Sequence, residues 1–235
     1  VSSTSGSSDV LEQLGVPMDL SPDQVARAVE EVGMGFMFAP AHHSAMRYAV
    51  GPRRELGLRT LFNILGPLTN PAGVKRQLIG VYSAELCLPI AKVLKMLGST
   101  HIMVVHAEDG LDEISLAGDT QVAELHDGNI SEYRLSPSDF SYATESLEGL
   151  AVSGAKESAE LIRAALSGKA TGDDRVRKAA AIIALNAGAC IYVSGLVATQ
   201  ADGVALAEDL IATGQALEKL NEFVEFTQTM SSEGK

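Results

Sequence analysis

The sequence is poor in cysteine, and this shortage excludes whole classes of protein. Its 235 residues include only Cys87 and Cys190, which lie far apart and have no Cys or His partner at metal-ligand spacing. A disulfide framework and a cysteine-based metal centre are therefore excluded. We predict that both cysteines are buried free thiols of a protein that works in a reducing compartment.

The sequence is also poor in positive charge. Lys and Arg total 18 against 30 Asp and Glu, so the formal net charge is −12 at pH 7. Such an acidic surface repels the phosphates of nucleic acids and of anionic membranes. We therefore expect neither nucleic acid nor a membrane as a partner, and a local cluster of groups must hold any phosphate that the protein binds.

Long hydrophobic runs are nearly absent as well. The charge-free stretch between Lys178 and Asp202 is long enough to cross a membrane, but it is rich in Ala and Gly and contains Asn186. This composition favours a buried core helix. No signal peptide is visible, so we expect a cytoplasmic location, and a lost plastid-targeting peptide stays open.

Helix signals occur towards both ends of the chain. A capped segment at residues 8–15 and another from Ser21 to Gly33, with proline in its first turn, predict two short helices. A helical region at 42–56 precedes a turn at 66–73 that holds two prolines and two glycines. Three further helical segments are predicted at residues 155–166, 175–193 and 204–235.

The middle of the chain predicts a sheet. Two buried strands at 77–82 and 100–106 enclose a helix at 83–98, an order typical of a parallel α/β sheet. Asp127-Gly128 then lies between two further strand patterns and is a strong hairpin signal. The predicted fold class is therefore α/β, with a mainly parallel sheet flanked by helices.

An acidic motif, "EDGLDEIS", follows the second predicted strand. Ligands of α/β proteins gather at the carboxyl ends of strands, and Asp112 and Glu113 place two adjacent carboxylates at such an edge. Oxygen ligands of this kind suit Mg²⁺, which takes one or two carboxylates together with substrate phosphates. The alternative is an ordinary solvated acidic loop.

A basic motif, "FAPAHHSAMRYAVGPRREL", stands out in this acidic chain at residues 38–56. Arginine presents a planar fork that matches a carboxylate or a phosphate, so the motif could receive an anionic substrate. The alternative is a helix surface that pairs with the surplus carboxylates of the protein. Its basic and histidine side chains are His42, His43, Arg47, Arg53 and Arg54.

A serine-rich opening, "VSSTSGSSDVLE", leads directly into the first predicted helix. Its composition alone is typical of a disordered tail. Hydroxyls and backbone amides at a helix N-terminus, however, suit phosphate oxygens. Together with "APAHHSAMRYAVGPRRELGLRTLFNILGPLTNPAG" and "DGLDEIS", this opening resembles the anthranilate phosphoribosyltransferases of tryptophan biosynthesis, in that order and at compatible spacing. The later segment "LNAGACIYVSG" agrees with the resemblance.

The resemblance implies a reaction, a fold and a set of site residues. The amino group of anthranilate would displace pyrophosphate from 5-phosphoribosyl 1-pyrophosphate (PRPP), with Mg²⁺ as cofactor and without a covalent nucleophile. The fold would be like that of nucleoside phosphorylases and phosphoribosyltransferases, with a small helical subdomain at 16–62 and an α/β domain at 1–15 and 63–235. The implied residues are Ser2, Ser3 and Ser7 for PRPP, Arg53, His43 and Pro67 for anthranilate, and Asp112 and Glu113 for Mg²⁺.

Family members also carry a glycine-rich pyrophosphate loop and helices of a dimer interface upstream of the serine motif. The resemblance therefore implies a truncated chain, a homodimer at full length, and impaired catalysis by these 235 residues alone. Two alternatives stay open on the sequence: a pyrimidine-nucleoside phosphorylase-like enzyme, and a non-catalytic nucleic-acid-binding relative of the same fold. The net charge of −12 argues against the second.

Overall fold

The computed structural model describes residues 6–38, 66, 68–169 and 172–233. The chain divides into two compact units. The first contains residues 1–59, 152–169 and 213–235, and its described elements are helical; the second contains residues 60–151 and 170–212 and holds the sheet. The predicted domain limits at residues 15 and 62 stay a prediction.

Four helices form the described part of the first unit: α1 (Ser7–Leu14), α2 (Pro22–Val32), α7 (Ala155–Leu166) and α10 (Gln215–Glu233). The predicted boundaries of the first two helices are confirmed. Ser21 caps α2, because its hydroxyl accepts a hydrogen bond from the backbone N–H of Gln24 at 3.3 Å. Both helices end at glycines with positive φ, Gly15 at 104° and Gly33 at 86°.

Segments far apart in the sequence supply the core of this first unit. Leu14 of α1 is buried against Ala159 of α7 and Leu220 of α10. The Arg163 guanidinium donates to the carbonyl of Leu14 at 2.9 Å, and thereby satisfies an acceptor at the carboxyl end of α1. The Gln24 side chain donates to the carbonyl of Met230, 206 positions later, at 2.8 Å. The first unit therefore depends on both ends of the chain.

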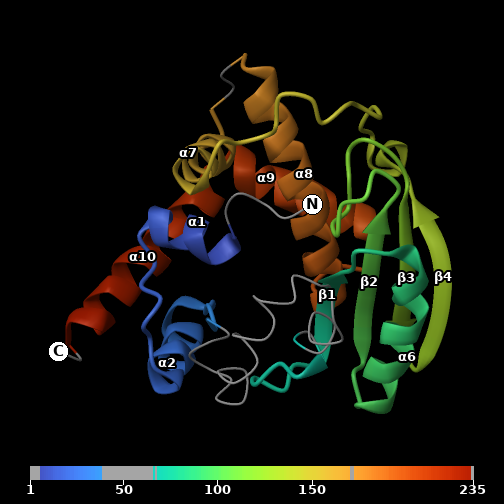
Figure 1. Cartoon of the computed structure of the whole chain (residues 1–235), viewed down its shortest axis with the longest axis horizontal. Coiled ribbons are helices and arrows are strands. Elements are labelled where there is room, and N and C mark those ends of the chain that lie inside the picture. Colours follow the sequence, from blue (N-terminus) through green and yellow to red (C-terminus); the bar gives the residue numbers. More distant parts are fainter. Residues whose placement is uncertain (1–5, 39–65, 67, 170–171, 234–235) are drawn as a thin grey trace, which may run out of the picture. The chain divides into compact units, whose positions relative to one another are not determined.

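The second unit is built on a four-stranded sheet in the order β1-β2-β3-β4 (Figure 1). The strands are β1 (Arg76–Gly80), β2 (His101–Ala107), β3 (Thr120–His126) and β4 (Asn129–Leu135). β1 and β2 are parallel, as predicted, and β3 and β4 form the predicted hairpin. Asp127 and Gly128 turn this hairpin with φ angles of 48° and 78°, the left-handed values that an Asp-Gly pair accommodates.

The direction of β3 corrects one part of the prediction. β3 runs antiparallel to β2, so the described sheet is mixed and not mainly parallel. The α/β fold class itself is confirmed. Residues 108–119 connect β2 to β3 without a crossover helix, so the chain turns back along β2 instead of crossing the face of the sheet.

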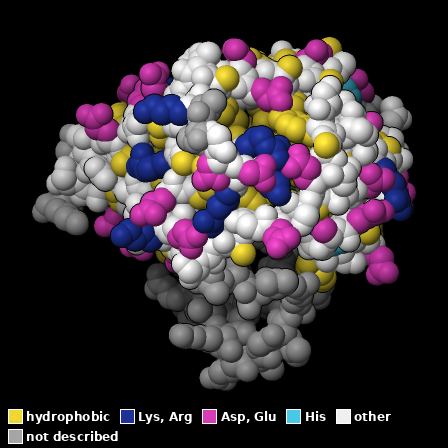
Figure 2. Space-filling view, turned by 90° about the horizontal axis from the view of Figure 1, so that it is seen from above, with side chains coloured by type: hydrophobic (Ala, Val, Ile, Leu, Met, Phe, Trp, Pro, Cys, Tyr) yellow, Lys and Arg dark blue, Asp and Glu magenta, His cyan; other side chains and the backbone are white. Residues whose placement is uncertain are grey.

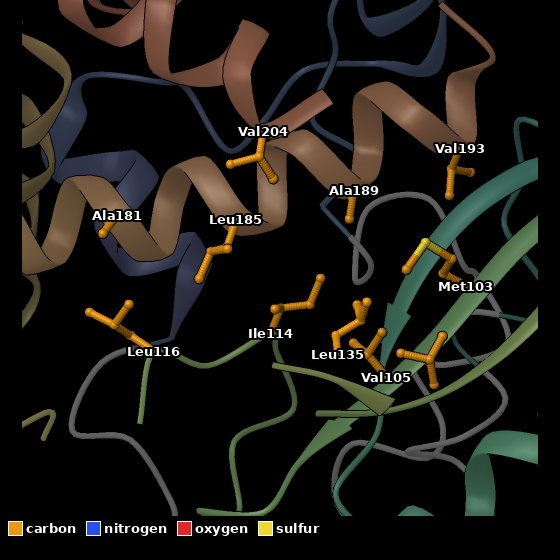
Figure 3. Packing of buried hydrophobic residues seen from close by; sticks show 11 residues of the cluster. Met103, Val105, Ile114, Leu116, Leu135, Ala181, Leu185, Ala189, Val193 and Val204 are labelled. Atoms are coloured by element: carbon orange, nitrogen blue, oxygen red, sulfur yellow. The ribbon is translucent and has the colours of Figure 1, made fainter. Parts of the chain in front are cut away.

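Helices cover both faces of this sheet. α6 (Cys87–Met96), which follows the short helix η2 (Ala84–Leu86), packs on one face with Ile102, Val104 and Leu125. α8 (Asp174–Ser194) packs on the other face, where Leu185 and its neighbours point towards Met103 and Val105 (Figure 3). Because successive residues of β2 alternate between the two clusters, the strand is buried on both sides. Ser83 precedes η2 as expected, but its side chain makes no capping hydrogen bond.

Two predicted features of the second half differ in detail. The helix predicted over 204–235 is divided into α9 (Gln200–Ala212) and α10, because Gly214 adopts a φ of 78° between them. Both cysteines are free, but Cys190 is exposed, which corrects the prediction that both are buried. Cys87 is buried as predicted, and burial raises the pKa of its thiol to about 11.

α8 is the one helix among the described residues that is long and apolar enough to cross a membrane. It corresponds to the charge-free stretch of the sequence. Ala181, Leu185, Ala189 and Val193 of this helix are buried in the core cluster over the sheet (Figure 3). This face of α8 therefore packs in the protein core, as predicted for a buried core helix.

α8 and α9 approach each other closely at two glycines. A Cβ atom added to Gly188 would lie 2.5 Å from the backbone nitrogen of Val204, and one added to Gly203 would lie 2.2 Å from the carbonyl oxygen of Gly188. Both neighbours are backbone atoms that cannot rotate away. The spacing of the two helices therefore requires glycine at both positions.

We expect Gly188→Ala to destabilise the protein. Overpacking costs about 1–3 kcal/mol, whereas a helical Gly→Ala change returns about 1 kcal/mol of helix propensity, so the expected net loss is up to about 2 kcal/mol. A lower midpoint of urea-induced unfolding would measure it. Gly118→Ala is the control, because the nearest atom to its added Cβ is 4.0 Å away. Equal midpoints for the two variants would show that the helices separate without cost.

Candidate metal and phosphate site

The acidic motif forms an ordered loop directly after β2. The backbone N–H of Ala107 donates to the carbonyl of Leu111 at 2.9 Å, which closes the first turn of the loop. The Asp109 carboxylate accepts hydrogen bonds from the backbone N–H of Leu111 at 3.1 Å and from the hydroxyl of Ser115 at 2.5 Å. Asp109 thus holds the loop together internally, while its neighbours Asp112 and Glu113 stay exposed.

Asp112 and Glu113 present two adjacent carboxylates that no basic group neutralises among the described residues. Protein atoms around Glu113, although its side chain is exposed, raise the pKa of its carboxyl group, and the negative charge of Asp112 raises it further. A divalent cation would remove this repulsion. Oxygen ligands at the carboxyl end of a strand fit Mg²⁺, so the residues present suit the ion that the sequence predicts.

Of the residues assigned to substrates, only Ser7 belongs to the described part of the chain. It is the first residue of α1, whose backbone amides are free to bind an anion only in the first turn. Asp9 uses that turn as well, because its carboxylate accepts from the backbone N–H of Gly6 at 2.8 Å. Ser2, Ser3, His43, Arg53 and Pro67 lie outside the described residues.

Two residues that contact the acidic loop, Asn186 and Gly80, are not among the site residues predicted from the sequence. Asn186 of α8 binds the backbone of Ile114: its side-chain amide donates to the Ile114 carbonyl and its oxygen accepts from the Ile114 N–H, both at 2.9 Å. Gly80, the last residue of β1, lies against Asp112, since an added Cβ would stand 1.6 Å from the Asp112 carbonyl oxygen. For Asn186, the sequence signal is a polar residue within the charge-free stretch that follows Lys178.

A second group of potential metal ligands lies at the opposite end of β2. Ligand atoms of His101, Glu124 and His126 lie within 4.8 Å of one another. The two imidazole rings stack at 4.0 Å and are inclined by only 4°, so their lone pairs lie in parallel planes and do not converge on one ion. The Glu124 carboxylate is also occupied, because it accepts from His101 at 2.8 Å, Tyr192 at 2.9 Å and Tyr133 at 2.7 Å.

This second group is therefore a buried hydrogen-bond network around Glu124. Burial lowers the pKa of His101 and so keeps that imidazole neutral near pH 7. Burial and the neighbouring carboxylate raise the pKa of Tyr192 to about 12, so its hydroxyl remains a donor. The donors satisfy a carboxylate that is only 7% exposed.

An open depression of about 730 Å³ lies beside the acidic loop. It is lined by Asp109, Leu111, Ala117 and residues 144–148, and does not include Asp112 or Glu113. Two of its lining side chains are acidic, Glu145 and Glu148, and Arg177 pairs with the Glu145 carboxylate. On the face of the molecule shown in Figure 2, acidic and basic side chains are interspersed. The coloured residues form no broad basic surface on this face.

The fold is that of an α/β protein, and an exposed pair of carboxylates follows the carboxyl end of one strand. The model of the glycosyl transferase family, α/β domain, matches residues 1–217. The chain therefore belongs to this glycosyl transferase family. Among curated proteins, it is 61% identical over 227 residues to the anthranilate phosphoribosyltransferase of Saccharophagus degradans and 60% identical over 228 residues to that of Cellvibrio japonicus.

These relatives are longer than the chain. In both cases the match covers 97% of this chain and 66% of the relative. The structure of anthranilate phosphoribosyltransferase from Thermus thermophilus superimposes with a TM-score of 0.86 at 41% identity, covering 95% of this chain and 64% of that chain. The Saccharomyces cerevisiae enzyme in complex with PRPP and Mg superimposes with a TM-score of 0.84 at 29% identity, covering 96% and 63%.

Proposed function

We propose that this chain forms the greater part of an anthranilate phosphoribosyltransferase. The enzyme would transfer the phosphoribosyl group of PRPP to the amino group of anthranilate, in tryptophan biosynthesis. One observation carries the proposal: on an ordered loop at a strand end stands a carboxylate pair that no basic group of the described residues neutralises, in a chain that is 61% identical to a relative of that name. The resemblance of the serine and arginine motifs supports the same substrates.

The proposed PRPP-binding residues are Ser2, Ser3 and Ser7, and the proposed Mg²⁺ ligands are Asp112 and Glu113. Serine hydroxyls and the first amides of a helix bind phosphate oxygens without requiring net positive charge. This suits a protein of net charge −12, in which phosphate must be bound locally. When bound, Mg²⁺ supplies the positive charge that neutralises the departing pyrophosphate.

The proposed anthranilate site consists of Arg53, with His43 and Pro67 shaping the channel around it. The Arg53 guanidinium would donate two hydrogen bonds to the anthranilate carboxylate and so orient the amino group towards the ribose. The bond from the anthranilate nitrogen to C1 of the ribose forms, and the bond from C1 to the pyrophosphate oxygen breaks with its electron pair. The nitrogen then loses a proton to solvent water. No protein nucleophile is required, so no residue is assigned a covalent role.

The proposal extends to the setting in which the enzyme works. We propose a homodimer at full length, located in the cytoplasm, with small-molecule substrates and neither nucleic acid nor a membrane as partner. The excess of 30 acidic over 18 basic residues supports the last two points, because it opposes binding to polyanions.

A direct assay tests the proposed function. We expect the full-length protein to consume anthranilate and PRPP in the presence of Mg²⁺ and to release one pyrophosphate per phosphoribosyl-anthranilate, measured by chromatography and mass spectrometry. The control replaces both substrates with a pyrimidine nucleoside and inorganic phosphate. Release of free base in the control, without transfer to anthranilate, would contradict the proposal and establish a nucleoside phosphorylase.

A further inference from the structure

We propose that Asn186 and Gly80 are positioning residues that hold the Asp112–Glu113 pair in the geometry required for Mg²⁺. The inference rests on the proposed function, because it concerns the same metal site. It adds two residues, from a helix and from a strand, that do not contact the ion themselves. They would act by fixing the loop backbone on both sides of the two carboxylates.

Asn186 fixes the loop immediately after Glu113. Its side-chain amide pairs with both backbone groups of Ile114, in the way that one strand pairs with another. The same side-chain nitrogen also donates to the carbonyl of Ile182, one turn earlier on α8, at 3.0 Å. Two carbonyls require a donor and one N–H requires an acceptor, so these partners determine the orientation of the Asn186 amide.

The side chain of Ile114 strengthens this attachment. It is only 3% exposed and packs in the core cluster with Leu116 and with Leu185, the neighbour of Asn186 (Figure 3). Backbone and side chain of one loop residue are thus both held at α8. The Cα atom of Glu113 is joined to that of Ile114 by one planar peptide of fixed length, so the attachment of Ile114 also restricts the position of Glu113.

Gly80 fixes the loop on the other side, at Asp112. The carbonyl carbon of Asp112 would be 2.6 Å from an added Cβ at Gly80, and its oxygen 1.6 Å, so the Asp112 peptide occupies the space that any side chain would fill. Gly80 is itself anchored in the sheet, where it pairs with Val105 of β2. Its φ is not positive, so close approach and not backbone conformation explains the glycine.

The two contacts leave the carboxylates exposed between two fixed points of the backbone. Ordering a flexible loop residue costs conformational free energy. A loop that is already ordered before the ion binds avoids this cost at the binding step. Residues that orient metal ligands from behind typically change metal affinity by about 10- to 100-fold when they are replaced. We expect an effect of that size here.

The experiment compares four single variants of the full-length protein. Asn186→Asp keeps the shape of the side chain and the oxygen that accepts from the Ile114 N–H, but its second oxygen then faces the carbonyls of Ile114 and Ile182. Gly80→Ala displaces the Asp112 peptide. Gly118→Ala, in the same loop but in open space, and Gly188→Ala, on the same helix as Asn186, are the matched controls. Binding of Mn²⁺, used as a paramagnetic probe for Mg²⁺, is measured by electron paramagnetic resonance, and exchange of the Ile114 amide proton by mass spectrometry or NMR.

We expect Asn186→Asp and Gly80→Ala to weaken Mn²⁺ binding about 10- to 100-fold, and both controls to bind like the parent protein. Exchange at Ile114 should accelerate in Asn186→Asp. Steady-state assays should show a raised half-saturating Mg²⁺ concentration with kcat largely restored at saturation. Gly188→Ala destabilises the same helix, so an equal loss of Mn²⁺ binding in that control would reduce Asn186 to a structural role and overturn the proposal.

A reference variant separates failure of this inference from failure of the proposed function. If Asp112→Asn/Glu113→Gln abolishes Mn²⁺ binding while Asn186→Asp and Gly80→Ala retain parental affinity, the positioning role is wrong and the metal site stands. If the reference variant itself binds Mn²⁺ like the parent protein, the metal site is wrong and the positioning role falls with it.

Discussion

Replacing Asp112 by Asn and Glu113 by Gln together is expected to reduce turnover at low Mg²⁺ by roughly 10²- to 10³-fold in the full-length enzyme. Both changes keep the size and polarity of the side chains and remove the negative charge that makes binding of the cation favourable. The departing pyrophosphate then develops charge without a counter-ion. Steady-state rates over a series of Mg²⁺ concentrations measure the loss, and part of it should return at high Mg²⁺.

The fold should survive this double change. The pKa of the Glu113 carboxyl group is raised in the folded protein, so the folded state favours the protonated, neutral form. The free energy of unfolding therefore falls as the pH rises and Glu113 ionises. A neutral Gln therefore costs no stability at neutral pH. Thermal unfolding is the control measurement. Unchanged activity with unchanged Mg²⁺ dependence would reduce the pair to ordinary surface acids and remove the metal site from the mechanism.

Arg53→Ala is expected to raise the KM for anthranilate about 10- to 150-fold while the KM for PRPP changes little. The range follows from the free energy of a charge-assisted hydrogen bond, about 1.5–3 kcal/mol, at a factor of ten for each 1.4 kcal/mol. Initial rates with each substrate varied in turn give both constants.

Arg54→Ala is the matched control for Arg53, because the two residues are adjacent and carry the same charge. It should leave both Michaelis constants near their parental values. Equal increases of both constants in Arg53→Ala would show a structural role for that residue, and a selective increase in Arg54→Ala would transfer the anthranilate contact to Arg54.

Local signals in the sequence predicted local structure well. Ser21 and Gly33 mark the ends of α2, and Asp127-Gly128 marks the hairpin, because each of these residues acts within a few positions of the backbone that it shapes. The acidic loop was found for the same reason. A strand followed by adjacent carboxylates is visible in one short stretch of sequence.

Long-range contacts could not be predicted in this way. The direction of β3 depends on the path of all of residues 108–119, and the Asp109-Gly110 turn signal in this segment determines only the backbone close to it. The contact of Asn186 with Ile114 joins positions 72 apart, and Gly80 meets Asp112 from another element. The sequence shows a polar residue in an apolar helix and a glycine at a strand end, but the fold alone supplies their partners.

The dependence of the first unit on both ends of the chain has a consequence for its synthesis. α2 is translated long before α10, yet Gln24 and Met230 are hydrogen-bonded and lie 206 positions apart. At about 5–20 residues per second, α2 must wait about 10–40 s for this partner. During that interval the side chains of Val32 and Ala28, buried in the finished protein against Phe223, have no core to enter. The nascent α2 therefore exposes these apolar side chains to solvent until α10 has been synthesised.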